Sequence, residues 1–351
     1  MGSKKIVTIK GLHIGGNNPV RVESMLKTPL TDTAACLREL EGLAAEGCEL
    51  VRVSFPEIAL KEQLAALAEQ SDIPLMADIH FDHRLALAAI DAGLPSIRIN
   101  PGNMGNKEGL AEVVRAAQAN GIVIRIGANG GSLSNKQLAQ AGGDRASALA
   151  AAVGEQVALL REQDFDDIII SAKSSNVMET VRANNILSQK YNYPVHIGIT
   201  EAGPGAAGIA KGAAGLSLML SQGVGDTLRV SLTAPGTEEV KTGYHILRAL
   251  GMRSRGVELI SCPTCGRKRV DVMKLTGLVQ EILAQMQMPA SAVTVAVMGC
   301  EVNGPREAAE ADIGVAGTPD GFALFKKGKH ICSGKIEELP LLLQNILKEL
   351  S

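Results

Sequence analysis

Strand-length apolar runs alternate with longer segments rich in Ala, Leu and Glu over the first two thirds of the chain. Most of the runs are separated by these helix-like segments, and this alternation predicts parallel βαβ units. Eight such units in about 250 residues match the usual size of a (β/α)8 barrel. We therefore expect a TIM barrel, with a short hairpin over residues 7–16 closing its bottom. The eight expected strands cover residues 19–24, 49–55, 73–81, 96–100, 122–128, 167–173, 194–200 and 226–232.

The pattern changes after the eighth run. A helix-like segment at 270–286 and an amphipathic segment at 338–350 alternate with further strand-like runs, which predicts a small α+β domain. A length of about 100 residues is common for a domain. We expect two domains, the substrate-binding barrel over residues 1–252 and the smaller domain over residues 253–351, joined by a polar, glycine-ended segment.

Composition narrows the classes of function. The chain has 351 residues, a formal net charge of -2 and no tryptophan. This charge gives no general attraction to nucleic acid or to anionic membranes, and the low aromatic content removes the stacking surfaces of single-strand binders. No apolar run approaches the ~18 residues of a membrane-spanning helix, and no signal-peptide pattern is present. We expect a cytoplasmic protein with no nucleic-acid or membrane partner.

Polar residues gather at the carboxyl ends of the predicted strands, where barrel enzymes place their chemistry. Strand alternation puts Arg98 and Asn100 on one face of their strand, and Arg229 and Ser231 on one face of theirs. The cations at these ends outnumber the acids. They are Arg52, Arg98, Arg125, Lys173 and Arg229, against Asp78 and Glu201.

This excess of positive charge predicts an anionic ligand. Guanidinium groups match phosphate oxygens, so a small diphosphate is the expected guest. The alternative is that each arginine pairs with an acid on a neighbouring loop, as surface arginines usually do. His196, taken alone, is more typical of a hydrogen-bonded core histidine than of a catalyst.

Three cysteines in the second domain form the other candidate site. Cys262 and Cys265 have C-x-x-C spacing, and Cys300 follows an apolar run. A redox pair leaves Cys300 unexplained. A structural zinc site could take Cys332 as its fourth ligand, whereas an iron–sulfur cluster could take an oxygen ligand such as Glu307. Spacing alone does not separate the cluster from zinc. Cys36 and Cys48 lie in helix-like sequence and are expected to be packing residues.

Six motifs together resemble a known family. They are SCPTCGR, VMGCEVNGPREA, ADIHF, RINPGN, HIGITEAG and GDTLRVSLT. The resemblance is to the bacterial, two-domain 4-hydroxy-3-methylbut-2-enyl diphosphate synthase family of the non-mevalonate isoprenoid pathway. It implies a TIM barrel followed by a [4Fe-4S] domain. It also implies an iron–sulfur oxidoreductase that opens and dehydrates 2-C-methyl-D-erythritol 2,4-cyclodiphosphate, with flavodoxin or ferredoxin as electron donor and a homodimeric assembly.

The resemblance also implies roles for residues. Glu201 would act as the acid or base at the reacting atoms. Cys262, Cys265 and Cys300 would bind the cluster, with Glu307 as a displaceable fourth ligand. The substrate would be held by Arg52, Asp78, Arg98, Asn100, Arg125, Lys173, His196, Arg229 and Ser231. Arg306 stands where the family pattern has glycine, and we expect strain there to affect the orientation of Glu307.

Two other hypotheses stay open at this point. One is a barrel transferase acting on a phosphorylated small molecule, with a zinc site formed by four cysteines. The other is a regulatory protein that binds a ligand without converting it and uses the metal domain for docking.

Overall fold

The structure is a computed structural model that describes residues 3–104, 107–266, 268–285, 293–300 and 310–349. It divides into two compact units, Met1–Arg253 and Ser254–Ser351. No helix in the described ranges is both long enough and apolar enough to cross a membrane.

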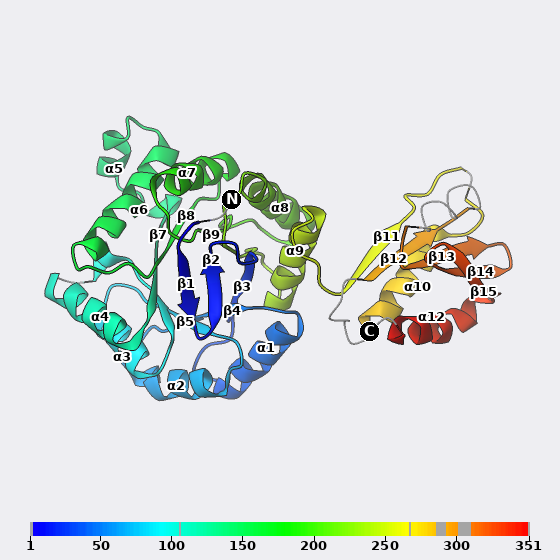
Figure 1. The fold of residues 1–351 in the computed structure, drawn as a ribbon, viewed down its shortest axis with the longest axis horizontal. Helices are drawn as coiled ribbons and strands as arrows, with labels where there is room; N and C mark the ends of the chain where they lie inside the picture. Colours follow the sequence, from blue (N-terminus) through cyan, green and yellow to red (C-terminus); the bar gives the residue numbers. More distant parts are fainter. Residues whose placement is uncertain (1–2, 105–106, 267, 286–292, 301–309, 350–351) are drawn as a thin grey trace. The chain divides into compact units, whose positions relative to one another are not determined.

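The first unit is a nearly closed barrel of eight parallel strands, as predicted (Figure 1). The strands follow one another around the barrel in chain order, and a single parallel bridge between Ile170 and Val195 joins the two ends of the sheet. The strands are β3 (Arg21–Met25), β4 (Leu50–Ser54), β5 (Leu75–Asp78), β6 (Ser96–Arg98), β7 (Val123–Asn129), β8 (Ile168–Lys173), β9 (His196–Ile197) and β10 (Thr227–Leu228).

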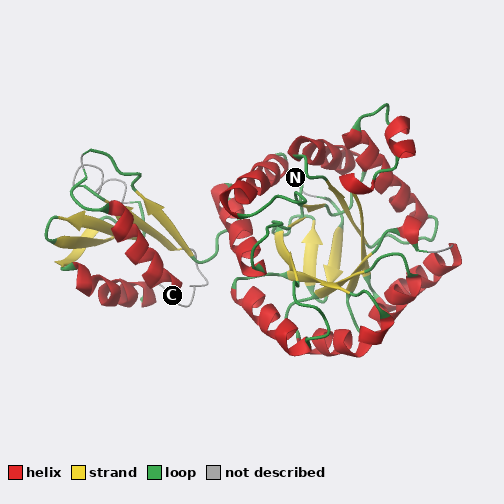
Figure 2. Ribbon diagram, turned by 180° about the vertical axis from the view of Figure 1, so that it is seen from behind, coloured by secondary structure: helices red, strands yellow, loops and turns green. Residues whose placement is uncertain are grey.

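Helices cover the outside of the barrel (Figure 2). Several begin at a side-chain cap, for example Asp32 accepting from the Ala35 amide and Asn176 accepting from the Glu179 amide. Such caps stabilise a helix by about 1 kcal/mol each. The helical segments are α1 (Thr33–Ala45), η1 (Ile58–Leu60), α2 (Lys61–Gln70), α3 (His83–Asp91), η2 (Pro101–Asn103), α4 (Lys107–Asn120), η3 (Gly130–Ser132), α5 (Asn135–Gln140), α6 (Arg145–Arg161), α7 (Val177–Lys190), α8 (Gly205–Ser221) and α9 (Gly236–Ala249).

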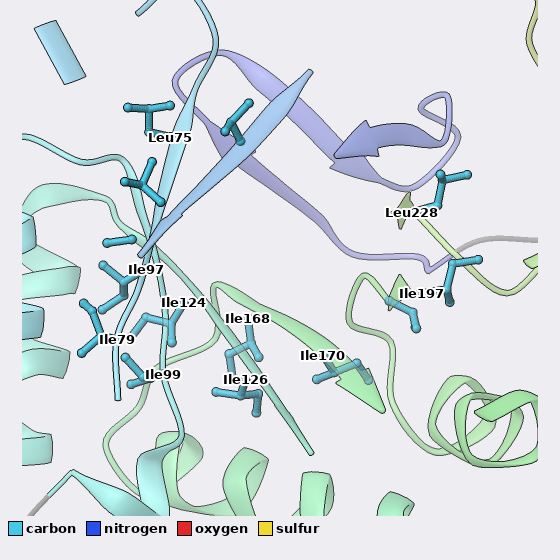
Figure 3. Close-up of a cluster of buried hydrophobic side chains, with 14 of the residues drawn as sticks. Leu75, Ile79, Ile97, Ile99, Ile124, Ile126, Ile168, Ile170, Ile197 and Leu228 are labelled. Carbon is cyan, nitrogen blue, oxygen red and sulfur yellow. The ribbon is translucent and has the colours of Figure 1, made fainter. Parts of the chain in front are cut away.

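Strand alternation decides which side chains enter the barrel. Ile97 and Ile99 are fully buried in the main core with residues of the surrounding helices, as are Ile124 and Ile126 (Figure 3). Successive side chains of a strand point to opposite faces. The residues between these isoleucines therefore point toward the barrel axis, and one of them is Arg125.

A two-stranded hairpin closes the amino-terminal end of the barrel, as predicted. Strands β1 (Ile6–Ile9) and β2 (Leu12–Gly15) pair antiparallel. Its apolar side chains pack against residues at the starts of four barrel strands: Val7, Ile9 and Ile14 meet Leu50, Met76, Val123 and Ile169. The carboxyl ends of the strands are left for the site.

The second unit is a five-stranded mixed sheet packed against helices. Three strands run parallel and the last two add antiparallel, in the order β11-β12-β13-β14-β15. Helices α10 and α12 bury their apolar sides against this sheet. The elements are β11 (Val257–Ser261), α10 (Val272–Ala284), β12 (Val293–Met298), β13 (Ile313–Thr318), β14 (Gly321–Lys326), β15 (Lys329–Gly334), η4 (Ile336–Glu338) and α12 (Leu339–Lys348).

Candidate active site

A polar cavity of about 210 Å³ lies at the carboxyl ends of the barrel strands. All five cations expected at the strand ends line it. The lining consists of Arg52, Arg98, Arg125, Lys173 and Arg229 together with Ile126, Gly127, Ala128, Asn129, Ser171, Thr200 and Ser231. A larger cavity of about 510 Å³ lies in the second unit, but none of its lining residues is a predicted site residue.

Asp78 holds two of the arginines. It ends β5, between β4 and β6, and its Oδ2 accepts a hydrogen bond from Arg52 Nη2 at 2.5 Å while Oδ1 accepts one from Arg98 Nη1 at 3.3 Å. Burial acts to raise the pKa of Asp78, but the two guanidinium groups outweigh burial and hold that pKa below its ordinary value. Asp78 is therefore ionised at neutral pH and fixes both arginines.

Glu23 holds a third arginine. Its side chain has no solvent exposure, and its two oxygens lie 2.7 and 2.6 Å from Arg125 Nη1. Burial lowers the pKa of Arg125 to about 10, and Glu23 opposes that shift. Arg125 consequently keeps its charge at neutral pH.

Glu239, in the first turn of α9, holds the fourth arginine. Its carboxylate accepts hydrogen bonds from Arg229 Nε and Nη2 at 3.3 Å, from Ser24 Oγ at 3.1 Å and from the Leu232 amide at 3.1 Å. Lys27 Nζ lies 3.1 Å from the same group. Glu239 thus ties the end of strand β10 to helix α9.

The Lys173 ammonium has no hydrogen bond or ion pair with any residue that the structure describes. Loss of water around the ammonium, followed by repulsion from Arg125 and Arg52, lowers its pKa well below the ordinary lysine value. Five cations therefore face three buried carboxylates. The expected excess of positive charge is present, but four of the cations have acidic partners. Of these three acids, Asp78 alone was predicted from the sequence.

His196 lies behind the cavity and does not line it. Its ring is fully buried, with Nδ1 2.7 Å from Thr227 Oγ1 and 3.2 Å from Glu23 Oε2, while Nε2 has no partner among the described residues. Burial, and then Lys173 and Arg125, lower the pKa of His196 well below its ordinary value. The ring is neutral at pH 7, and its Nδ1 hydrogen-bonds the Thr227 hydroxyl.

The other expected substrate residues divide into two groups. Ser231 lines the cavity. Asn100 instead caps the turn η2, where its Oδ1 accepts from the Gly102 amide at 3.1 Å. Glu201 lies exposed on the loop after β9 with φ 53, and its backbone carbonyl accepts from Lys211 Nζ at 3.2 Å.

The three cysteines of the second unit lie in two neighbouring loops. Cys262 follows β11 and Cys300 follows β12, and these strands are parallel neighbours. Two backbone hydrogen bonds of 2.9 Å join the loops, from Cys262 N to Val297 O and from Arg269 N to Gly299 O. Cys265 is exposed in the same loop as Cys262, and none of the three cysteines is joined in a disulfide.

This arrangement fits a group held by three thiolates from one end of a sheet. In the ranges that the structure describes, no three candidate ligands are already grouped around a common metal position. Glu307 and Arg306 lie outside the described residues.

The sheet does not support a zinc site with Cys332 as the fourth ligand. Strand register runs from Val297 to Val315, Leu324 and Cys332, so Cys332 is three strands away from Val297. At about 4.8 Å per strand this is ~14 Å, whereas zinc–sulfur bonds are about 2.3 Å. Cys332 instead packs against the core of this unit.

Family models match both units of the chain. The GcpE TIM-barrel domain matches residues 4–244, and the GcpE protein C-terminal domain matches residues 258–349. The chain belongs to the GcpE family.

Relatives of this GcpE chain match over nearly its full length. A protein from Caldanaerobacter subterraneus subsp. tengcongensis is 45% identical, covering 98% of this chain and 95% of its own length. One from Listeria monocytogenes is 43% identical, with 98% and 92% covered. Both are named 4-hydroxy-3-methylbut-2-en-1-yl diphosphate synthase (flavodoxin).

Two solved structures match part of this chain. Dihydropteroate synthase from Yersinia pestis matches with 14% identity and a TM-score of 0.48, covering 71% of this chain and 100% of that one. 3-Dehydroquinate dehydratase from Geobacillus kaustophilus matches with 16% identity and a TM-score of 0.49, with 71% and 99% covered. A likeness this weak says nothing about the substrate.

Two acids of the GcpE site were not predicted. Glu23 stands in the middle of the barrel strand β3, where a buried carboxylate requires a partner, so a signal was present in the sequence. Glu239 stands in the first turn of a helix, where acids are common for another reason, the helix dipole. Its burial depends on the packing of α9 against β3, which no local pattern reveals.

Proposed function

We propose that this GcpE-family enzyme binds 2-C-methyl-D-erythritol 2,4-cyclodiphosphate in the barrel cavity and reduces it to 4-hydroxy-3-methylbut-2-enyl diphosphate. The observation that carries the proposal is the cavity itself, where five cations face only three carboxylates. A doubly phosphorylated ring supplies the missing negative charge. The names of the relatives support the same product.

The arginines bind and orient the diphosphate. Asp78, Glu23 and Glu239 each fix a guanidinium before the ligand arrives, so little order has to be created on binding. Lys173 has no acid partner in the described ranges and adds a charge that the ligand can satisfy. Arg52 Nε, buried and without a partner in the structure, is a further donor for a ligand oxygen.

Cys262, Cys265 and Cys300 are proposed to hold a [4Fe-4S] cluster in the second domain, with Glu307 as the fourth ligand. The joined loops after β11 and β12 support this assignment, because they bring the three thiols to one end of two adjacent strands. Such a cluster would supply electrons one at a time. Residues 1–252 would then bind substrate and residues 253–351 would hold the cofactor.

The reaction takes up two electrons, breaks a carbon–oxygen bond of the ring and loses a hydroxyl as water, which requires a proton. We propose Glu201 as the acid or base, since its loop directly follows β9 and is next to Thr200 of the cavity wall. Asn100 and His196 are proposed as supporting residues that hold the turn after β6 and the Glu23 carboxylate.

Flavodoxin is the proposed electron donor, because the relatives carry it in their names, with ferredoxin as an alternative. We also propose a homodimer located in the cytoplasm. The six cysteines support this location, because none of them is joined in a disulfide and disulfides are rare in reducing compartments.

Turnover under strictly anaerobic conditions tests the function. Protein loaded with iron and sulfide, given reduced flavodoxin and the cyclic diphosphate, should yield the open-chain diphosphate, detected by phosphorus NMR. Cys300→Ser should lose iron and activity, whereas the matched Cys332→Ser should keep both. Iron-loaded protein that binds the substrate without converting it would instead indicate a regulator. Equal iron loss in both variants would contradict the ligand assignment.

A further inference from the structure

Glu23 and Arg125 form an ion pair that crosses the barrel. β3 and β7 are the first and fifth strands of the eight, so they stand on opposite sides of the barrel axis. Both oxygens of Glu23 reach one nitrogen of Arg125, at 2.7 and 2.6 Å. Arg125 lines the cavity while Glu23 does not, so the carboxylate acts from behind the cavity wall.

The same carboxylate has a second neighbour. His196 Nδ1 lies 3.2 Å from Glu23 Oε2, on β9. The same ring nitrogen hydrogen-bonds Thr227 Oγ1 at 2.7 Å, and the neutral ring adds no charge. Among the described residues, Arg125 is therefore the cation that forms an ion pair with Glu23.

The charges that face Lys173 come from five strands of the barrel. Arg125, Arg52 and Arg229 repel its ammonium, and Glu23 attracts it. Neutral His196 is also close by. The other two carboxylates are engaged elsewhere, Asp78 by two arginines and Glu239 by Arg229 and Lys27. Glu23 is thus the acid that favours a protonated Lys173.

We propose that Glu23 is a positioning residue for the diphosphate: it fixes the Arg125 guanidinium across the barrel and offsets part of the positive charge that Arg125 adds to the cavity shared with Lys173. Glu23 itself does not touch the ligand. This inference rests on the proposed function, because it takes a diphosphate as the guest of the cavity.

Ligand binding should then be coupled to a proton. In the free protein the pKa of Lys173 is depressed, and an anion beside it restores that pKa toward the ordinary value. A group whose pKa is higher in the complex than in the free protein strengthens binding, and its full contribution is present when the pH is below its pKa in the free protein. That contribution is lost as pH rises through the pKa in the complex.

Titration of anaerobically loaded enzyme with inorganic pyrophosphate and with the cyclic diphosphate tests the proposal. Calorimetry in buffers of different ionisation enthalpy gives the number of protons taken up. Glu23→Gln keeps the size and removes the charge. In this variant the pH midpoint of proton uptake should fall. Its affinity loss relative to wild type should grow as pH rises toward the wild-type midpoint, reaching about 10-fold, as expected for the loss of one charged interaction.

Two further variants separate charge from structure. Glu23→Asp keeps the charge and should keep the wild-type pH profile, even though its shorter reach weakens binding. Glu46→Gln makes the same change in an outer-surface ion pair with Lys241 and should change nothing. If Glu23→Gln does not fold, the pH profile of Glu23→Asp still decides, because a profile displaced from that of wild type would contradict the proposal.

Three results would overturn the inference. One is wild-type binding of pyrophosphate without proton uptake, another is an unchanged pH profile in Glu23→Gln, and the third is an affinity loss in Glu23→Gln that is equal at every pH. The proposed function fails separately, if loaded wild-type enzyme binds pyrophosphate with proton uptake but does not convert the cyclic diphosphate.

Discussion

Replacing Asp78 with asparagine should destabilise the barrel strongly. Asp78 is the partner of both Arg52 and Arg98, whose side chains are only 12% and 14% exposed. An amide has one acceptor oxygen, so Asp78→Asn can keep at most one of the two bonds and leaves the charge of both guanidinium groups without compensation. Removing one partner of a buried ion pair costs about 3–5 kcal/mol. Slight exposure of the arginines favours the lower figure, about 3 kcal/mol.

Thermal unfolding of the full chain measures this effect. A loss of about 3 kcal/mol corresponds to a fall in Tm of roughly 6–12 °C for a domain of this size. The pKa of Asp78 is below its ordinary value, so its contribution is present at neutral pH and is lost as pH falls through the folded-state pKa. The gap between wild type and variant should thus be constant from pH 5 to 8 and narrow in stronger acid.

A surface pair gives the matched control. Asp82→Asn removes the charge beside the exposed Arg84 but retains a residue that caps α3, so its Tm should change little. If Asp78→Asn lowers Tm no more than this control does, the two arginines do not depend on Asp78 and the account of the cavity is wrong.

Three further predictions each rest on one observation of the structure. Burial raises the pKa of the Cys48 thiol to about 12. A disulfide reagent at pH 8 should therefore modify exposed Cys265 quickly in the metal-free protein and modify Cys48 only when the protein unfolds. Rapid labelling of Cys48 in the folded protein would contradict this. Gly299→Ala would place a methyl group 2.1 Å from a side-chain carbon of the first residue of α10, which should displace the loop of Cys300 and reduce the amount of bound iron. The control Gly277→Ala meets nothing within 4 Å and should leave the iron content unchanged. Equal iron in both proteins would refute the close approach. Lys173→Met should weaken pyrophosphate binding at pH 6 and abolish the proton uptake that accompanies binding. If this variant still takes up a proton on binding, the proton belongs to another group.

Much of the fold could be predicted from local patterns, because each strand has to bury one apolar face. The isoleucines on either side of Arg98 and Arg125 make this alternation visible in the sequence. The lengths of β9 and β10 were predicted less well, since each strand has two residues where seven were expected. The ladder continues beyond them through a hydrogen bond from Arg229 N to Ile197 O.

The site residues that lie at the ends of strands could be predicted from the sequence. The ion pairs between these residues and distant acids could not. All five expected cations line the cavity, because the carboxyl ends of parallel barrel strands meet at one face. Their acids were harder to find. Glu23 pairs with a residue 102 positions away across the barrel, and Glu239 becomes buried only when α9 packs on β3.

Calorimetric titration of iron-loaded, oxidised enzyme with the cyclic diphosphate tests most directly whether the barrel cavity is its site. Wild type should bind one molecule per chain. Arg98→Met leaves Asp78 paired with Arg52 and should weaken binding at least about 10-fold, as expected for loss of a charged hydrogen bond, while Arg84→Met on the surface should bind like wild type. Equal affinity in all three proteins would contradict the account.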